Sequence, residues 1–163
     1  SNIHACGGIF FDFSYLWLRL GHSVRAKSNR TAVMFLKRLS LINFKNIGQE
    51  EFPLSEGINC FVGDNGTGKT NLLDAIHYLS MCKSAFNLTD LQCTRHGTDA
   101  FVVNGVYTAR DGRNENIVCS CSKGHPKKLC RGGKEYDKLS DQIGVIPIVM
   151  VTPSDTAANT STA

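Results

Sequence analysis

The sequence predicts an α/β fold from three observations. Residues 58–62 form a short apolar segment, which is typical of a buried strand. A glycine-rich loop follows at 63–70, and the segment after the loop has helical periodicity. Residues 101–110 and 116–121 have strand patterns and are joined through Asp111-Gly112, a hairpin turn signal. A strand–loop–helix unit followed by paired strands indicates an α/β domain that carries an antiparallel β subdomain.

Two further strands are expected before the loop. The chain becomes regular at Met34, and residues 35–44 alternate and are bounded by Lys45-Asn46, as in an edge-type strand. Residues 48–52 form a second, shorter strand, and a turn connects it to the buried strand.

The loop leads into a helix that is expected from about Lys69 to Cys82. Four apolar residues mark one face of that helix: Leu72, Leu73, Ile76 and Leu79. Beyond the predicted hairpin, the expected elements are a strand at 127–130, a turn at 131–133, a short helix at 139–143 and a strand at 145–151 that starts at or near Pro147.

The composition is that of a soluble globular protein. The 163 residues suffice for one hydrophobic core and are too few for two ordinary domains. Hydrophobic residues make up 42% and charged residues 20%, which excludes an intrinsically disordered chain. The net charge of +4 is compatible with a nucleic-acid partner but does not require one.

The compartment is predicted from the apolar segments and the cysteines. Residues 9–20 include Asp12 and Arg19, and they are shorter than the roughly 18 apolar residues that a membrane span needs. A secretory signal is not expected either, because residues 1–8 lack the positive charge that would precede its apolar run. We therefore expect a cytoplasmic protein with seven reduced thiols: Cys6, Cys60, Cys82, Cys93, Cys119, Cys121 and Cys130.

The pattern divides the chain into three segments. Residues 1–33 lack regular periodicity and begin with Ser, which favours an appended or read-through segment over a genuine extension. Residues 34–156 form the predicted domain. Residues 157–163 are small and polar and are expected to be a loose tail.

The loop fits the phosphate-binding pattern G-x-x-x-x-G-K-S/T at every position. Glycines allow successive backbone N–H groups to form a concave nest for phosphate oxygens, and the following helix adds free N–H groups and its positive dipole end. Lys69 supplies charge to the β- and γ-phosphates, and the Thr70 hydroxyl is a Mg²⁺ ligand. A glycine turn that merely caps a helix is the weaker alternative. The residues expected to hold ATP are Gly63, Asp64, Asn65, Gly66, Thr67, Gly68, Lys69 and Thr70.

From Met34 to about Asp155 the sequence resembles the RecF family of bacterial recombination-repair ATPases, whose heads belong to the ABC, SMC and Rad50 group of P-loop proteins. Residues 41–46 (Leu-Ile-Asn-Phe-Lys-Asn) resemble the opening L-x-x-F-R-N strand and turn of that group. The loop and residues 71–76 (Asn-Leu-Leu-Asp-Ala-Ile) resemble the RecF phosphate loop and helix. Comparable RecF-like segments are Asn104-Gly105, Gly132-Gly133-Lys134 and residues 146–153.

The resemblance implies the N-terminal lobe of an ABC-type ATPase head. The family binds DNA at single-strand/double-strand gap junctions, acts in replication, recombination, DNA damage repair and the SOS response, and loads a recombinase with RecR and RecO. It also implies a homodimer that sandwiches ATP between two heads. Lys45 and Asn46 would lie near the nucleotide, with Lys45 in place of a commoner Arg that makes bidentate phosphate contacts. Val149 stands about where the family has its Q-loop glutamine.

Hydrolysis in that family needs two further motifs. One is the signature motif offered to the partner's ATP, and the other is a Walker B strand that ends in acidic residues. Neither follows the loop within the 163 residues, and the nearest Walker B lookalike, 9–12, precedes the loop and has no adjacent Glu. The full-length family is implied to be a weak DNA-dependent ATPase. We expect this chain to bind a nucleotide without hydrolysing it, and we predict no catalytic residue.

Two weaker patterns lie between residues 119 and 138. Cys119, Cys121, His125 and Cys130 have a spacing that fits no familiar zinc knuckle, so packed or exposed thiols are favoured over a zinc site. Basic residues of the predicted hairpin are candidates for contacts with DNA phosphates, and a solvated hairpin face is an equally good interpretation. These candidates are Lys123, Lys127, Lys128 and Arg131.

Two other functions remain open at this point. Another SMC or Rad50-type head shares the loop but is interrupted by a long coiled coil, and no heptads begin in this sequence. A small P-loop kinase would carry an Arg-bearing lid after the phosphate helix, and the sequence has no Arg cluster there.

Overall fold

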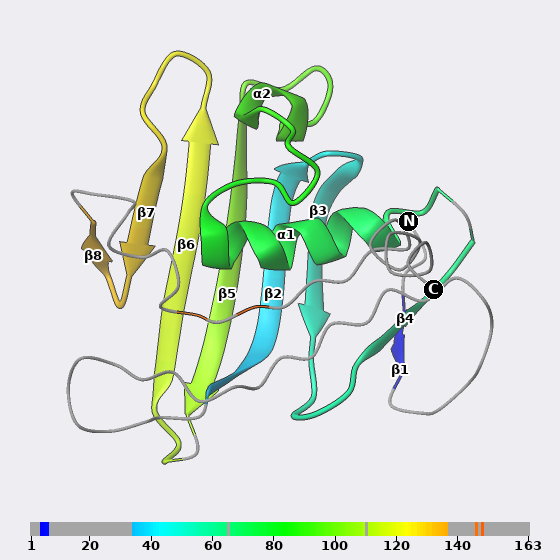
Figure 1. Ribbon diagram of the computed structural model, residues 1–163, viewed down its shortest axis with the longest axis vertical. Coiled ribbons are helices and arrows are strands. Elements are labelled where there is room, and N and C mark those ends of the chain that lie inside the picture. The colour runs from blue at the N-terminus through cyan, green and yellow to red at the C-terminus, as the bar shows by residue number, and fades with distance from the viewer. Residues whose placement is uncertain are drawn as a thin grey trace, which may run out of the picture.

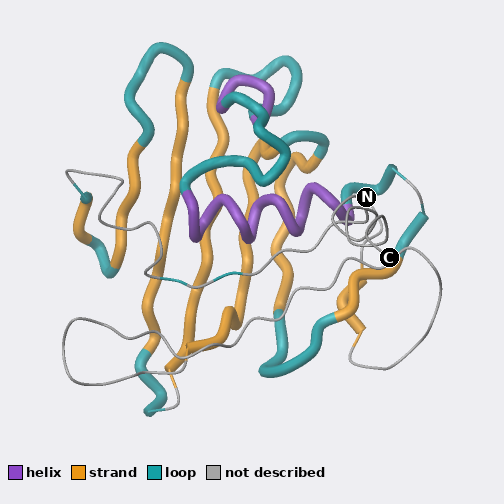
Figure 2. The backbone as a smooth tube through the Cα atoms, viewed as in Figure 1, coloured by secondary structure: helices purple, strands orange, loops and turns teal. Residues whose placement is uncertain are grey.

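The computed structural model describes residues 4–6, 34–64, 66–109 and 111–136, together with Ile146 and Ile148. An antiparallel sheet of six strands forms one layer, and one long helix crosses a single face of it (Figures 1 and 2). The strand order in this sheet is β3-β2-β5-β6-β7-β8. The six strands are β2 (Met34–Phe44), β3 (Ile47–Pro53), β5 (Ala100–Ala109), β6 (Asn114–Ser122), β7 (Lys128–Arg131) and β8 (Lys134–Glu135).

The phosphate-loop strand lies apart from the large sheet. This strand, β4 (Cys60–Val62), pairs antiparallel with β1 (His4–Cys6) in a two-stranded sheet. It leads through residues 63–68 into α1 (Lys69–Met81), so the predicted strand–loop–helix order is confirmed. A second, one-turn helix, α2 (Asp90–Cys93), follows α1.

The core lies between α1 and the sheet. Residues of β5 alternate between buried and half-buried, because every second side chain faces the helix. Tyr78 of α1 packs edge-to-face against Phe44 and Phe101, with ring centroids 5.9 and 5.4 Å apart. At Gly105 a Cβ would lie 2.6 Å from a methyl carbon of Leu79, so the helix approaches the sheet backbone closely there.

Two expectations about the strands are wrong. Residues 34–44 do not form an edge strand, because β2 pairs with β3 on one side and with β5 on the other. Lys37, Arg38 and Ile42 of β2 are exposed, Ile42 at 42%, because one face of the sheet is open. The strand predicted at 58–62 is shorter and not buried, since Ile58 is 63% and Val62 50% exposed.

The remaining elements agree with the prediction where the structure describes them. The strands predicted at 101–110, 116–121 and 127–130 correspond to β5, β6 and β7. The expected helix at 139–143 and most of the strand at 145–151 lie outside the described residues, as do nearly all of segments 1–33 and 157–163. Neither described helix has the length and apolar character of a membrane span.

Candidate nucleotide-binding site

The phosphate loop folds as a tight turn at the start of α1. Gly66 and Gly68 have φ angles of 83° and 109°, which residues other than glycine rarely adopt. The backbone N–H and hydroxyl of Thr67 both donate to the carbonyl of Asp64, at 3.4 and 2.8 Å. Asn65 lies outside the described residues. The described part of the loop therefore has the backbone curvature that a phosphate nest needs.

Lys69 is turned inward onto the loop. Its ammonium donates hydrogen bonds to the backbone carbonyls of Gly63 and Asp64, the latter at 2.7 Å. Thr70, the next residue of α1, is exposed. A movable positive charge and an exposed hydroxyl thus lie on adjacent residues at the end of the helix where its N–H groups are free.

Asn46 reaches the loop from the β2–β3 turn. Its amide nitrogen donates to the carbonyl of Gly66 at 3.2 Å, and its amide oxygen accepts from Asn71 of α1 at 2.8 Å. A Cβ on Gly68 would lie 2.8 Å from that oxygen, so the glycine leaves the space that Asn46 fills. Asn46 thus lies against the loop, and its expected place near a nucleotide stays a prediction.

Lys45 points away from the loop and under α1. Its ammonium forms an ion pair with Asp74 at 2.5 Å, and the two side chains are 10% and 0% exposed. Asp74 also accepts from the Ser84 hydroxyl and the Ala85 N–H, each at 2.7 Å. A direct contact of Lys45 with a nucleotide stays a prediction, because its charge is matched here by Asp74.

A pocket of about 890 Å³ opens beside the β2–β3 turn. Its lining runs from the turn to α2 and to the segment before β5: Lys45, Asn46, Leu91, Gln92, Thr94, Arg95, His96, Gly97 and Thr98. A volume of this size can take a nucleoside-sized ligand. Asn46 lines this pocket and also donates to the loop carbonyl of Gly66, so it lies between the two.

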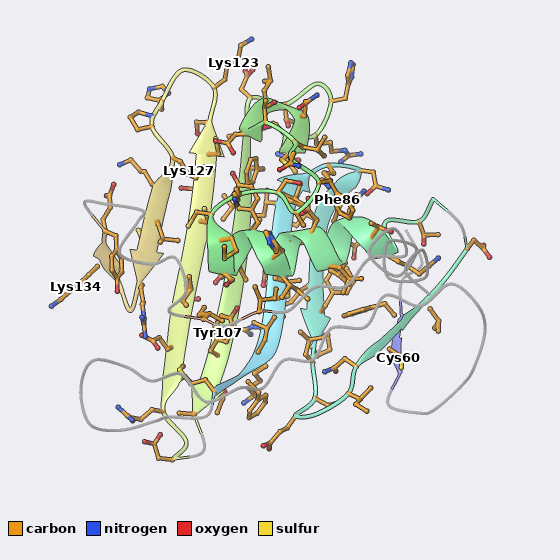
Figure 3. The ribbon with its side chains drawn as sticks, viewed as in Figure 1. Cys60, Phe86, Tyr107, Lys123, Lys127 and Lys134 are labelled. Carbon is orange, nitrogen blue, oxygen red and sulfur yellow. The ribbon has the colours of Figure 1, made fainter. Side chains whose placement is uncertain are left out.

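The basic residues of the β6–β7 hairpin are separated in the structure. Lys123 is exposed at the loop end of β6, whereas Lys127 lies over the ring of Tyr78 at 4.7 Å and pairs with Asp90 at 2.9 Å (Figure 3). Arg131 is held by two hydrogen bonds to Glu115, and Lys128 pairs with Glu135 at 3.4 Å. Lys123 and Lys128 therefore present the most accessible charge, and Lys127 and Arg131 have structural partners.

The thiols of the hairpin do not converge. Cys119 pairs with Leu129 across the sheet, and Cys130 pairs with Val118, so Cys119 and Cys130 face opposite sides. Within the described residues no group of three His, Cys, Asp or Glu side chains is arranged to hold a metal. The six cysteines with described side chains form no disulfide with one another.

Burial changes the titration of two groups near α1. It raises the pKa of the Cys93 thiol to about 11, although the nearby Lys45 ammonium opposes the shift. Burial and a hydrogen bond to Asp90 raise the pKa of Tyr78 well above its ordinary value. Both groups are therefore neutral at physiological pH.

The sequence reasoning missed Asp74, Asn71 and the pocket residues that follow α1, from Leu91 to Thr98. Asp74 and Asn71 belong to a segment that resembles RecF, but no local pattern shows their partners. The α2 turn did have a local signal, since Thr89 and Gln92 form a capping box.

Three curated relatives are similar to this chain in sequence. RecF, the DNA replication and repair protein, of Bacteroides fragilis is 52% identical over 122 residues, which are 75% of this chain and 33% of that protein. RecF of Phocaeicola vulgatus is 50% identical over the same shares, and RecF of Flavobacterium johnsoniae is 50% identical over 75% of this chain and 34% of that protein. The chain spans about a third of the length of the curated relatives it matches.

Solved structures show the same fold. The recombination mediator RecF with ATP, of the RecFOR pathway, has a TM-score of 0.65 and 26% identity, covering 69% of this chain and 31% of that one. An SMC ATPase studied for ATP-driven dimerization and DNA-stimulated activation has a TM-score of 0.67 at 19% identity, covering 78% of this chain and 92% of that one. The predicted P-loop ATPase head is thus confirmed, with an antiparallel sheet beside α1.

The AAA ATPase domain family model matches residues 34–138, which include the loop, α1 and the whole large sheet. Together with the relatives, this match confirms the resemblance drawn from the loop and its flanking segments. The chain belongs to the AAA ATPase domain family, and its sequence and fold are similar to about a third of RecF, a DNA replication and repair protein.

Proposed function

We propose that this chain is the ATP-binding lobe of a RecF-like DNA repair ATPase. The observation that carries the proposal is the loop between β4 and α1, where two left-handed glycines, the Lys69 ammonium and the start of a helix converge. This combination is suited to the charge and shape of the phosphates of a nucleoside triphosphate.

The triphosphate is held by the backbone of the loop, namely Gly63, Asp64, Asn65, Gly66, Thr67 and Gly68, and by the side chain of Lys69. The left-handed φ angles of Gly66 and Gly68 and the inward position of Lys69 fit this role. Mg²⁺ would be held by the exposed hydroxyl of Thr70 and would supply charge neutralisation of the phosphates. The base and ribose occupy the pocket that Asn46 joins to the loop.

The larger function rests on the relatives. A RecF-like cytoplasmic protein would bind DNA at gaps, pair with a second head when ATP is bound, and act with RecR- and RecO-type mediators in recombinase loading. The accessible charges of Lys123 and Lys128 support a DNA contact near the β6–β7 hairpin.

Titration calorimetry with ATP and ADP, with and without Mg²⁺, tests the proposed function. We expect binding that strengthens when Mg²⁺ is present, and a smaller effect of Mg²⁺ in Thr70→Ala. The Thr108→Ala variant, at a half-buried position of β5 outside the loop and the pocket lining, should keep the wild-type response to Mg²⁺. If the wild-type chain shows no affinity for either nucleotide at millimolar concentration, the proposal is wrong.

A further inference from the structure

Two adjacent residues of the β2–β3 turn point in different directions. Lys45 has a left-handed φ of 53° and directs its side chain beneath α1, while Asn46 directs its amide to the phosphate loop. The turn thus connects the buried side of the helix with the loop that precedes it.

The Lys45 side chain is fixed at its charged end. Asp74 is fully buried, and two other donors, the Ser84 hydroxyl and the Ala85 N–H, occupy its oxygens. The ammonium also lies 5.1 Å from the ring centroid of Phe86. The Lys45 ammonium is therefore strongly held beside Asp74, because moving it away would leave the buried carboxylate without its counter-charge.

The Lys45 backbone is fixed as well. Its N–H donates to the carbonyl of Cys93 at 2.8 Å, and the N–H of Arg95 donates to the carbonyl of Asn43 at 2.8 Å. The turn is therefore held on one side by the segment that lines the pocket and on the other side by α1. This leaves Asn46 little freedom to move relative to the loop.

We propose that the Lys45–Asp74 ion pair is a positioning device that holds Asn46 against the phosphate loop. Lys45 then acts on nucleotide affinity through Asn46 and not through contact with phosphate. Asn46 contacts the carbonyl of Gly66 and the side chain of Asn71, so it ties the loop to the first turn of α1. The inference rests on the proposed nucleotide site and adds the cause of its preorganisation.

The competing arrangement has Lys45 leave Asp74 and bind phosphate directly. A thermodynamic cycle separates the two. If Lys45 acts through Asn46, removing the ion pair and removing the Asn46 amide abolish the same contribution to ATP affinity. The two losses of binding free energy then do not add. If Lys45 binds phosphate, the two costs are independent and add.

The experiment measures the affinity for Mg²⁺-ATP by calorimetry, and thermal unfolding, on the full chain. The variants are Asn46→Ala, the paired replacement Lys45→Met/Asp74→Asn, and the triple variant. The paired replacement is used because Lys45→Met alone would leave a buried, unpaired carboxylate and could prevent folding. Arg38→Met/Glu51→Gln is the control, since it removes an exposed ion pair at 3.8 Å between β2 and β3, the two strands that the turn connects.

We expect Asn46→Ala to weaken affinity about five- to tenfold, the effect of one lost hydrogen bond, with an unfolding temperature close to that of the wild type. The paired replacement should weaken affinity to a similar degree, and the triple variant no further. The control should bind as the wild type does.

Two results overturn the inference. One is a triple variant whose loss is the product of the two separate losses. The other is an Asn46→Ala variant with wild-type affinity while Lys69→Ala has lost binding, which would leave the proposed function intact. Loss of binding in the wild type itself would instead contradict the proposed function.

Discussion

The Lys69 ammonium donates a 2.7 Å hydrogen bond to the backbone carbonyl of Asp64, five residues earlier in the phosphate loop. The ammonium group that would contact the β- and γ-phosphates is thus hydrogen-bonded to the loop's own carbonyls. Binding a nucleotide exchanges these neutral acceptors for charged phosphate oxygens, and hydrogen bonds between two charged partners are the stronger ones.

Replacing Lys69 by Ala should weaken the binding of Mg²⁺-ATP about ten- to hundredfold, because one charge-assisted hydrogen bond contributes roughly 1.5–3 kcal/mol. Calorimetry on wild type and Lys69→Ala measures the change. Lys37→Ala is the control, since Lys37 is exposed on β2 and lies outside the loop. Equal affinities of wild type and Lys69→Ala would contradict the role of Lys69.

Gly68→Ala should lower nucleotide affinity more than Gly112→Ala. Both glycines have a left-handed backbone, with φ angles of 109° and 82°, so both substitutions carry backbone strain. Only the Cβ at Gly68 meets another residue, the amide of Asn46, whereas that at Gly112 has nothing within 4 Å. Comparable losses of affinity in the two variants, measured by calorimetry, would show that strain alone and not the contact with Asn46 matters.

The sequence predicted the elements whose signal is local. Alternation located β5 and β6, the turn signal at Asp111-Gly112 located their connection, and the loop pattern fixed the start of α1. It did not predict that β2 is an interior strand. The alternation of side chains along a strand shows only that one face of the sheet is exposed. Whether the strand lies at an edge depends on its pairing with other strands, and β2 pairs on both sides.

The contacts that shape the site are not local, and sequence patterns could not predict them. In the sequence Asp74 is one polar position of the expected helix, and only the fold shows that Lys45 forms an ion pair with it and that the Ser84 hydroxyl donates to it. Lys127 and Arg131 were grouped by sign of charge, yet their carboxylate partners, Asp90 and Glu115, come from distant positions. Charge counts along a segment cannot separate structural from accessible lysines.

Alkaline pH should destabilise the fold partly through Cys93. Burial raises the pKa of Cys93 from the ordinary 9.0 to about 11, so the folded protein holds the thiol proton more tightly than the unfolded chain does. The contribution of Cys93 is fully present below pH 9, and it is lost as the pH rises from 9 to 11. Chemical unfolding at several pH values should show a shallower decline in the free energy of unfolding for Cys93→Ala. Parallel pH profiles for the two proteins would contradict this.

DNA binding should depend on the exposed lysines of the hairpin. Reversing Lys123 and Lys128 to Glu should reduce DNA affinity and lower the slope of affinity against salt by about two, because each phosphate contact contributes about one. Fluorescence anisotropy at several salt concentrations measures both quantities.

The control for the DNA prediction is Lys37→Glu/Arg38→Glu, which reverses the same number of charges on β2. Reversal of Lys127 or Arg131 would be harder to interpret, since both support the fold through ion pairs with carboxylates. If the salt slope of Lys123→Glu/Lys128→Glu equals that of the wild type, the DNA surface lies elsewhere.

The chain by itself should have no meaningful ATPase activity. Holding phosphates stabilises the ground state and the transition state alike, and uniform binding does not lower the chemical barrier. Acceleration needs a group that orients the attacking water and charge that meets the transition state. In RecF-like heads these are implied to come from Walker B acidic residues and the partner's signature motif.

Two carboxylates lie nearest to the phosphate site in the sequence, those of Asp64 and Asp74. Asp74 is fully buried and bound to Lys45, Ser84 and Ala85, so it is not free to orient a water. Asp64 belongs to the loop itself, and its carbonyl accepts from Lys69. Phosphate release by the purified chain should therefore match that of Lys69→Ala at every protein concentration. Turnover that scales with the wild-type chain and disappears in Lys69→Ala would show that these residues already contain a complete catalytic site.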